Sequence, residues 1–404
     1  MSFRFLARSA AFLAAATTVA GCSNVVGSKP DTGPTQPTAA PAAESPLARF
    51  HRVTAITCSP ARRQEALAHG SGAFCAPFDS IPAVTHPRFL ASVHAKLPRN
   101  EPVVALELVG AARAYPVRYL VYHEIVNDVV DGHPVVVTFC PLCDSAAAHS
   151  RRVGSRILTF GVSGQLEYLN LVMFDRQTLS RWQQITGEAV GGELEGRRLA
   201  PLPAQLVSFG EWRAEHPAGL VMRAPEPEEY RYGLDPYGGY DSDPAEQSPL
   251  LRSSANPEGQ KADARLPPKW RVVGVATRDG SVAFAVPARS RRPVVATARL
   301  GSLPLLAFFR FGTAQAEQSQ RLASAPKGWS ATVWSAWLDG RRLHFRVVDG
   351  RFVETRTGSV FNFFGHGRSG SLAGRKLEAV PQASAFWFAW SHFHPDTAIR
   401  WAGG

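Results

Sequence analysis

The chain has 404 residues, of which 45% are hydrophobic and 19% are charged, and its formal net charge is +11. This composition is typical of a globular protein with a substantial core, and the length allows two domains of ordinary size. The arginines stand in scattered pairs without an interleaved aromatic run, so we predict no nucleic-acid partner despite the basic balance.

The first predicted element is a lipoprotein signal peptide at residues 1–21. Two arginines form a positive region, residues 10–20 form an apolar stretch too short to span a bilayer, and small residues precede Cys22. We expect Cys22 to be acylated and to attach the mature chain to membrane lipid. The expected location is the cell envelope, facing the periplasm, and the outer membrane in a two-membrane bacterium because Ser23 follows the cysteine. An ordinary secretory signal is the alternative.

Residues 22–47 are rich in Gly, Ser, Pro, Thr and Ala without apolar periodicity, which predicts a disordered tether. An N-terminal extension follows at residues 48–79, with a helix predicted at 60–69. Its two cysteines, Cys58 and Cys75, most simply form a structural disulfide in an oxidising compartment. In the alternative, they supply half of a metal site with the two cysteines described below.

The first module is predicted at residues 80–232, where short apolar runs alternate with turn dipeptides such as Asp131-Gly132. A helix is expected at 87–96, followed by strands at 103–108, 112–116, 134–139, 157–162 and 169–174. The expected fold class is β-rich α+β, with two pseudo-repeated β modules and a few short helices.

The strand predicted at 134–139 runs directly into Cys140-Pro141-Leu142-Cys143. Two thiols at this spacing can close a small disulfide ring or bind one soft metal ion. A structural zinc site needs a second pair of ligands at knuckle spacing, which the sequence lacks. Two buried thiols or a structural disulfide remain a third interpretation.

The companions of these thiols lie just upstream, in the run His123-Glu124-Ile125-Val126-Asn127-Asp128. A histidine near a thiol can accept its proton or share a metal ion. Glu124 and Asp128 could orient that histidine or carry protons. His149 and Thr138 are weaker candidates. Each of these residues taken alone is more often a local hydrogen-bonding group.

A linker is predicted at residues 233–268, and a second module at 269–404 repeats the first. Spaced Thr, Ser, aromatic, Gly, Trp and His-Pro positions of residues 175–217 recur in the same order at 354–395.

The two copies differ at the thiols, because Arg310 stands opposite Cys140 and Thr313 stands opposite Cys143. The second module is therefore thiol-free. Residues present in both copies, such as Asp175 and Trp182 with their counterparts, most simply serve folding.

Three segments together resemble the family catalogued as domain of unknown function 3179: the run 123–128, the Cys-Pro-Leu-Cys loop with its strand, and Leu-Val-Met-Phe-Asp-Arg-Gln-Thr at 171–178. The resemblance covers residues 80–404 and implies no established activity. It implies that some members carry selenocysteine within this loop, which favours redox chemistry over structural zinc. The chain departs from the family pattern at 167–170 and 359–362, and neither departure changes the residues of the loop.

Two hypotheses follow. In the first, the chain is a membrane-tethered thiol redox enzyme, a thiol-disulfide oxidoreductase, with Cys140 as nucleophile, Cys143 as resolving thiol, and His123 and Glu124 as proton carriers. In the second, it is a protein that binds copper, zinc or a protein partner without turnover, with Cys140, Cys143 and His123 as metal ligands. The sequence names no substrate and no protein partner.

Overall fold

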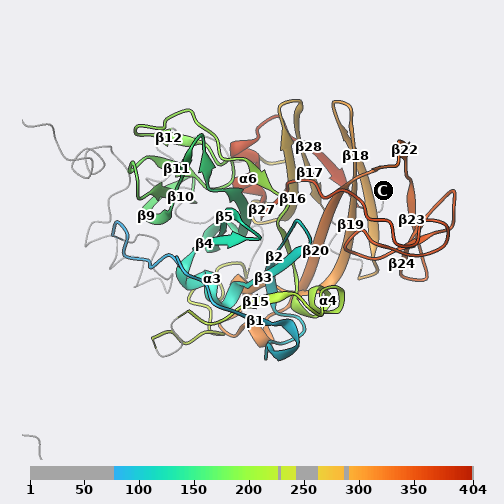
Figure 1. Cartoon of the computed structure of the whole chain (residues 1–404), viewed down its shortest axis with the longest axis horizontal. Coiled ribbons are helices and arrows are strands. Elements are labelled where there is room, and N and C mark those ends of the chain that lie inside the picture. The colour runs from blue at the N-terminus through green and yellow to red at the C-terminus, as the bar shows by residue number, and fades with distance from the viewer. Residues whose placement is uncertain (1–76, 226–228, 243–262, 286–290, 403–404) are drawn as a thin grey trace, which may run out of the picture. The chain divides into compact units, whose positions relative to one another are not determined.

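The structure, a computed structural model, describes residues 77–225, 229–242, 263–285 and 291–402 (Figure 1). These residues form many short strands and three α-helices, α3 (Val117–His123), α4 (Phe209–Glu215) and α6 (Trp387–Phe393). The β-rich α+β class is therefore confirmed. No helix in this part of the chain is long and apolar enough to cross a membrane.

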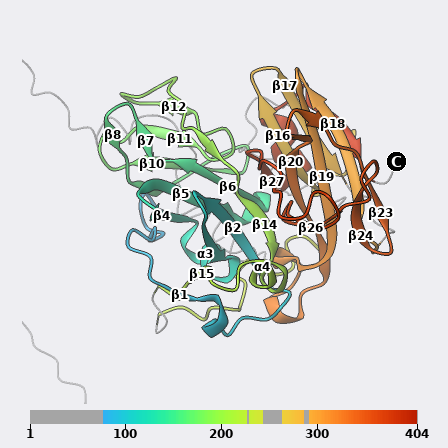
Figure 2. The ribbon, with the colours of Figure 1, turned by 45° about the vertical axis from the view of Figure 1, so that its right-hand side comes forward.

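The largest sheet carries the thiols and takes strands from both halves of the chain. Its order is β28-β17-β16-β27-β6-β5-β4, with β13 also paired to β6. The strands are β4 (Ile125–Val130), β5 (His133–Cys140), β6 (Ser145–Ser150), β13 (Pro201–Leu202), β16 (Arg271–Thr277), β17 (Gly280–Ala285), β27 (Ala383–Phe386) and β28 (Ala398–Trp401). The halves join where Ser384 of β27 pairs with Ala146 of β6 (Figure 2).

A second sheet has the order β1-β15-β3-β2-β14, and a third has the order β18-β19-β20. β14 lies against β20, so these two sheets also bring the halves of the chain together. The strands are β1 (Phe89–Ala91), β2 (Pro102–Leu108), β3 (Ala111–Pro116), β14 (Gln205–Ser208), β15 (Leu220–Met222), β18 (Val294–Leu300), β19 (Leu303–Ala314) and β20 (Lys327–Ser335).

Two small four-stranded sheets complete the main architecture, in the orders β12-β11-β10-β9 and β23-β24-β25-β26. Their strands are β9 (Phe160–Glu167), β10 (Asn170–Asp175), β11 (Arg181–Gln183), β12 (Ala189–Gly191), β23 (Phe345–Val348), β24 (Arg351–Glu354), β25 (Val360–Phe361) and β26 (Gly367–Ser369). Two short ribbons pair β7 (Arg152–Val153) with β8 (Arg156–Ile157), and β21 (Trp337–Leu338) with β22 (Arg341–Arg342).

The strand order repeats between the halves. The order β14-β2-β3-β15 corresponds to β27-β16-β17-β28, and in each set the last strand follows a helix, α4 or α6, and pairs in parallel. Matching contacts accompany the order: a Cβ added to Gly192 would lie 2.7 Å from Cα of Ser180, and one added to Gly370 would lie 2.8 Å from Cα of Ser359. The module boundaries themselves stay a prediction.

The alternation of side chains along β5 determines on which face of the sheet Cys140 lies. Val135, Val137 and Phe139 pack into one buried cluster with β2 and α3, whereas Val136 and Cys140 pack into another. Successive side chains of a strand point to opposite faces of the sheet, and Val136 and Cys140, four positions apart, share one. That face is covered by the β9–β10 hairpin and by α6.

The helix predicted at residues 87–96 is wrong. Phe89–Ala91 form β1 and only Ser92–His94 make a 3-10 turn, η1. Pairing of β1 with β15 outweighs the local helical preference, as tertiary contacts often do. The helix predicted at 60–69 lies outside the described residues. The other 3-10 turns are η2 (Pro141–Cys143), η3 (Ala316–Gln318) and η4 (Leu322–Ser324).

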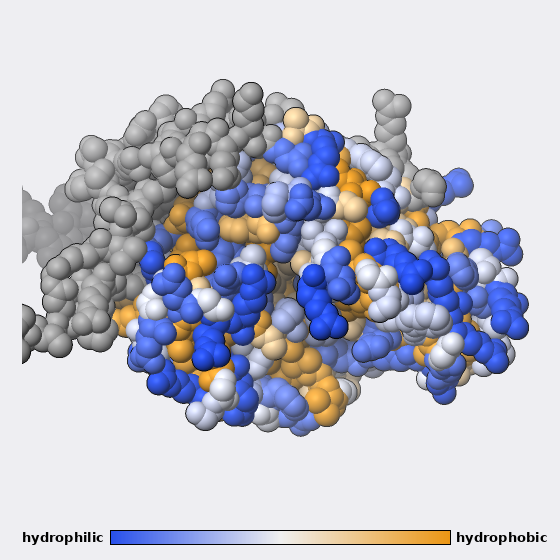
Figure 3. All heavy atoms as spheres, turned by 90° about the horizontal axis from the view of Figure 1, so that it is seen from above, coloured by the Kyte–Doolittle hydropathy of each residue, from blue (hydrophilic) through white to orange (hydrophobic). Residues whose placement is uncertain are grey.

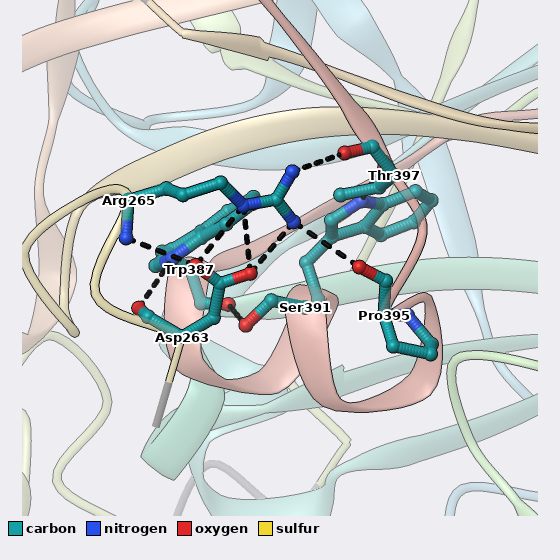
Figure 4. Close-up of polar contacts among 7 residues, drawn as sticks. Asp263, Arg265, Trp387, Ser391, Pro395 and Thr397 are labelled. Carbon is teal, nitrogen blue, oxygen red and sulfur yellow. Dashed lines mark hydrogen bonds and ion pairs between the residues drawn. The ribbon is translucent and has the colours of Figure 1, made fainter. Parts of the chain in front are cut away.

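The end of the predicted linker is anchored on α6 (Figure 4). Arg265 donates to the carbonyl oxygen of Thr397 at 2.8 Å, and its guanidinium lies 5.2 Å from the ring centroid of Trp387. The Trp387 indole donates to the carbonyl oxygen of Asp263 at 2.9 Å. This part of the linker is therefore a packed loop.

The face seen in Figure 3 mixes hydrophilic and hydrophobic residues.

Candidate thiol site

The two thiols lie in the turn that joins β5 to β6. β5 ends at Cys140, η2 follows, and Asp144 with a φ of 44° leads into β6. Proline suits the first position of a helical turn because its φ is fixed and no N–H is left unpaired. Both cysteines are reduced, and Cys140 and Cys143 are only 2% and 0% exposed. The thiol loop, Cys140–Cys143, is thus shielded from solvent.

Both sulfurs converge on one backbone oxygen. The Leu169 carbonyl oxygen lies 3.2 Å from Sγ of Cys143 and 3.7 Å from Sγ of Cys140. Burial, together with a hydrogen bond to Cys140, raises the pKa of the Cys143 thiol well above its ordinary value. Cys143 is therefore a protonated thiol at neutral pH.

The Leu169 carbonyl is presented by a strained turn. Tyr168 and Leu169, the hairpin tip, connect β9 to β10 with φ of 47° and 62°. Such turns favour Asn-Gly or Asp-Gly, and the β23–β24 hairpin has Asp349-Gly350 at φ of 47° and 74°. A non-glycine residue held in this region costs on the order of 1–3 kcal/mol, and such strain gathers at functional sites.

The β9–β10 hairpin of the first half is longer than the corresponding β23–β24 hairpin of the second half. β10 has 6 residues and its counterpart β24 has 4, so the first hairpin extends beyond the second by two residues. At its end, the Tyr168 ring stacks on His392 of α6, with centroids 4.0 Å apart and planes 7° apart. This contact fixes the hairpin tip over the thiol loop.

A buried amide cluster lies beside the sulfurs. Ser145 donates to Oε1 of Gln184 at 2.7 Å, Asn170 donates to both of them at 2.9 Å, and Gln184 donates to Thr138 at 2.9 Å. Gln183 donates to Oδ1 of Asn170. The Asn170 side chain also hydrogen-bonds with the Cys143 thiol. A fully satisfied network of this kind holds the turn in one arrangement.

An acid centre, formed by Asp144, Asp241, Glu317 and Arg271, adjoins the end of the loop at Asp144. The Arg271 guanidinium binds the carboxylates of Asp144 and Asp241, and its third nitrogen lies 3.1 Å from Glu317. All three acids are buried. One cation therefore faces three carboxylates, which come from three separate segments of the chain.

Several carboxyl groups around this centre hold protons more tightly than usual. Burial raises the pKa of Glu124 to about 8 and that of Asp235 to about 6. Burial and the Asp144 carboxylate raise the pKa of Glu317. Among the described residues, one oxygen each of Asp235, Asp241 and Glu317 is buried without a hydrogen-bond partner. A proton held by Asp235 or by Glu317 would satisfy such an oxygen, because an unpaired buried charge is costly.

Glu124 and Tyr237 connect this acid group with the thiols. Glu124 has a φ of 56°, and its carbonyl accepts from the N–H of Phe139, next to Cys140. Burial raises the pKa of Tyr237, and the charges of Glu124 and Cys140 raise it further. The predicted candidate Glu124 is thus brought to the thiol side of the site.

His123 is placed differently. Its Nδ1 lies 2.7 Å from the Pro82 carbonyl oxygen and its Nε2 lies 2.6 Å from the Tyr232 hydroxyl, so both ring nitrogens have partners other than sulfur. Burial lowers its pKa. The ring also lines a cavity of about 210 Å³ together with Arg88 and Arg223. A role for His123 as thiol partner stays a prediction.

The other sequence candidates have contacts of their own or are simply buried. Asp128 binds Arg113 and accepts from Tyr115 at 2.7 Å. Asn127 exchanges two hydrogen bonds of 2.8 Å with the backbone of Phe160. His149 is buried, and burial lowers its pKa to about 4.

Asp175 and Trp182 belong to the repeated framework. Asp175 accepts from the Trp182 indole at 2.9 Å and from the Thr178 hydroxyl. Its counterpart Glu354 accepts from the Thr357 hydroxyl at 2.7 Å. The carboxylate thus closes a turn in both halves.

No group of three or more His, Cys, Asp or Glu side chains in the described ranges could hold a metal ion. Cys22, Cys58 and Cys75 lie outside those ranges, so the predicted lipid anchor, the predicted disulfide and a metal site shared with the N-terminal cysteines remain predictions.

The thiol loop, with its hairpin and its acid centre, lies inside the region that a family model recognises. The model, described as Protein of unknown function (DUF3179), matches residues 78–397. The chain belongs to this family. No curated protein and no solved structure matches it. The DUF3179 match includes every residue of the site described above.

Proposed function

We propose that the chain is a thiol redox protein in which Cys140 and Cys143 cycle between a dithiol and a disulfide. The observation that carries the proposal is the convergence of both thiols on the Leu169 carbonyl oxygen, at 3.7 and 3.2 Å. The two thiols share one acceptor and only two residues separate them in the loop. A small movement is therefore enough to form a disulfide between them.

The reaction balances with a low-molecular-weight disulfide as oxidant. The Cys140 thiolate attacks one sulfur of the reagent and releases one thiol, and Cys143 then displaces the second thiol to close the protein disulfide. Cys140 is the proposed nucleophile, because the raised pKa keeps Cys143 protonated until the second step. The two protons of the dithiol end on the two released thiols.

Glu124 is the proposed proton carrier. A carboxyl group with a pKa of about 8 exchanges its proton near neutral pH, which an ordinary glutamate does not. Glu124 was proposed from the sequence together with His123, and its place beside Phe139 and Tyr237 supports it.

We further propose that the protein is a lipoprotein held on the periplasmic side of the cell envelope through Cys22. The support is the sequence pattern of residues 1–22 alone. Replacement of Cys22 by Ser should release the protein from membranes and remove the acyl mass. Unchanged fractionation and mass would contradict it.

The test of redox function compares the full chain with Cys140→Ser and Cys143→Ser variants. Each protein is equilibrated with reduced and oxidised dithiothreitol. The mass of the peptide that contains Cys140 and Cys143 is then measured by mass spectrometry. We expect reversible loss of two hydrogen atoms in the parent and in Cys58→Ser and Cys75→Ser controls. We expect none in the two loop variants.

Copper and zinc content measured on the same samples distinguishes the alternative function. One metal ion per parent chain, lost in both loop variants and accompanied by no disulfide, would support the metal-binding protein instead.

A further inference from the structure

The hairpin tip stands between the thiols and any reactant. Leu169 is fully buried in the same cluster as Cys140 and Cys143, and its carbonyl oxygen accepts from both thiols. A reactant of any kind can approach the sulfurs along this side only after the tip has moved.

The base of the tip is irregular. The β9–β10 ladder shifts register between Val172 and Met173, and Gly164 on the facing strand has a φ of 74°. A bulge of this kind bends a strand and weakens the ladder locally. Beyond it, the pairs from Val172–Gln165 to Asn170–Glu167 hold the end of the hairpin together. The Asn170 side chain and the Leu171 carbonyl also bind β10 to Ser145 and Gln184.

Two features of the hairpin tip have opposite effects on the stability of its closed conformation. The positive φ values of Tyr168 and Leu169 disfavour the closed turn. The stack of Tyr168 on His392, with Phe388 at 6.2 Å between centroids, favours it. In the second half of the chain, where Arg310 and Thr313 stand in place of the thiols, the shorter hairpin has an Asp349-Gly350 turn, whose residue types tolerate positive φ better than Tyr168-Leu169. Strain and thiols therefore occur in the same copy.

We infer that residues 165–171 form a lid over the thiol loop, hinged at the Gly164 and Val172 bulge. The lid is held closed by the stack of Tyr168 on His392 and by the hydrogen bonds of Asn170 to Ser145 and Gln184. This inference rests on the proposed redox function, since it describes how reactants gain access to the same two sulfurs. Opening frees Cys140 and Cys143 from the Leu169 carbonyl and exposes them together.

The test measures alkylation of Cys140 and Cys143 by iodoacetamide in the native full chain, followed peptide by peptide. His392→Ala removes the stack on Tyr168, and we expect alkylation about fivefold faster than in the parent. His392→Phe keeps a stacking ring and should restore the parent rate. The matched control is His394→Ala, because the His394 ring packs at a tilt against Trp390, with centroids 4.1 Å apart.

Global unfolding is excluded by measuring each variant's unfolding rate in urea and its hydrogen exchange. We expect faster exchange confined to residues 165–171 in His392→Ala. Equal alkylation rates in His392→Ala and the parent, or acceleration only in proportion to global unfolding, would overturn the lid. Because alkylation needs no oxidant, it tests the lid even if no Cys140–Cys143 disulfide ever forms.

Discussion

Asp144, the residue that follows Cys143, binds the guanidinium of Arg271 at the start of β16. The thiol loop of the first half is thereby tied to a strand of the second half. The same guanidinium holds Asp241 and Glu317, so a single cation is shared by three carboxyl groups beside the thiols.

Replacement of Arg271 by Gln should therefore destabilise the protein strongly. It leaves three buried carboxyl groups without their cation, and removal of one partner from a buried ion pair costs about 3–5 kcal/mol. Urea unfolding at pH 7 measures the loss. Arg197→Gln, at an exposed position, is the control and should change stability by less than about 0.5 kcal/mol. An Arg271→Gln protein as stable as the parent would show that the acid centre is neutral without its arginine.

Glu124 should make the folded protein less stable as the pH rises. Its pKa is about 8 when folded and 4.5 ordinarily, so the folded state binds the extra proton between these values and stability falls across that window. Glu124→Gln should remove this contribution, which is at most about 5 kcal/mol. Unfolding free energies at pH 5 and pH 8 measure it, with the exposed Glu195→Gln as control. An unchanged pH slope in Glu124→Gln would contradict the raised pKa.

Gln184 should contribute to the stability of the folded protein through the buried amide cluster. Replacement by Met fills the space but leaves Thr138, Ser145 and Asn170 without a shared partner, a loss of about 1–3 kcal/mol. Gln177, which accepts from the backbone of Thr159 at an exposed position, provides the matched Gln177→Met control. Thermal and urea unfolding compare the two variants. Equal small effects would mean that the buried amide cluster is not needed to hold the loop.

The charge around the thiols should select among reactants. Asp144 and Asp241 share the single cation of Arg271, which leaves a net negative charge beside the thiols. We therefore expect cationic cystamine to oxidise the pair about tenfold faster than neutral bis(2-hydroxyethyl) disulfide. The advantage should shrink with added salt. Rates with free cysteine correct for the intrinsic reactivity of each reagent. A faster reaction with the neutral reagent after this correction would refute the electrostatic selection.

The sequence predicted those parts of the site that are local in the chain. An apolar run followed by Cys-Pro-Leu-Cys indicates a buried strand and a turn, and β5 indeed ends at Cys140. Asp131-Gly132 does form the hairpin turn between β4 and β5, with both residues at positive φ. The helix expected at 87–96 failed because β1 pairs with β15, a partner far along the chain.

The remainder depends on long-range contacts or on strain. Tyr168-Leu169 carries no turn signature, since neither residue favours positive φ, and only the departure from the family pattern at 167–170 marked it. Arg271 and Glu317 reach the thiol loop from the second half of the chain, and no local pattern predicts that meeting. His123 lies next to Glu124 in sequence, yet its ring bonds to Pro82 and Tyr232.

The most direct measurement of the central claim is the state of the Cys140–Cys143 peptide in cells that produce the full chain. Acid quenching and alkylation trap thiols as they are, and mass spectrometry then separates the dithiol from the disulfide. The account predicts that both forms are present and that brief treatment with a reductant or a small disulfide shifts their ratio reversibly. Two alkylated thiols under every condition would contradict it.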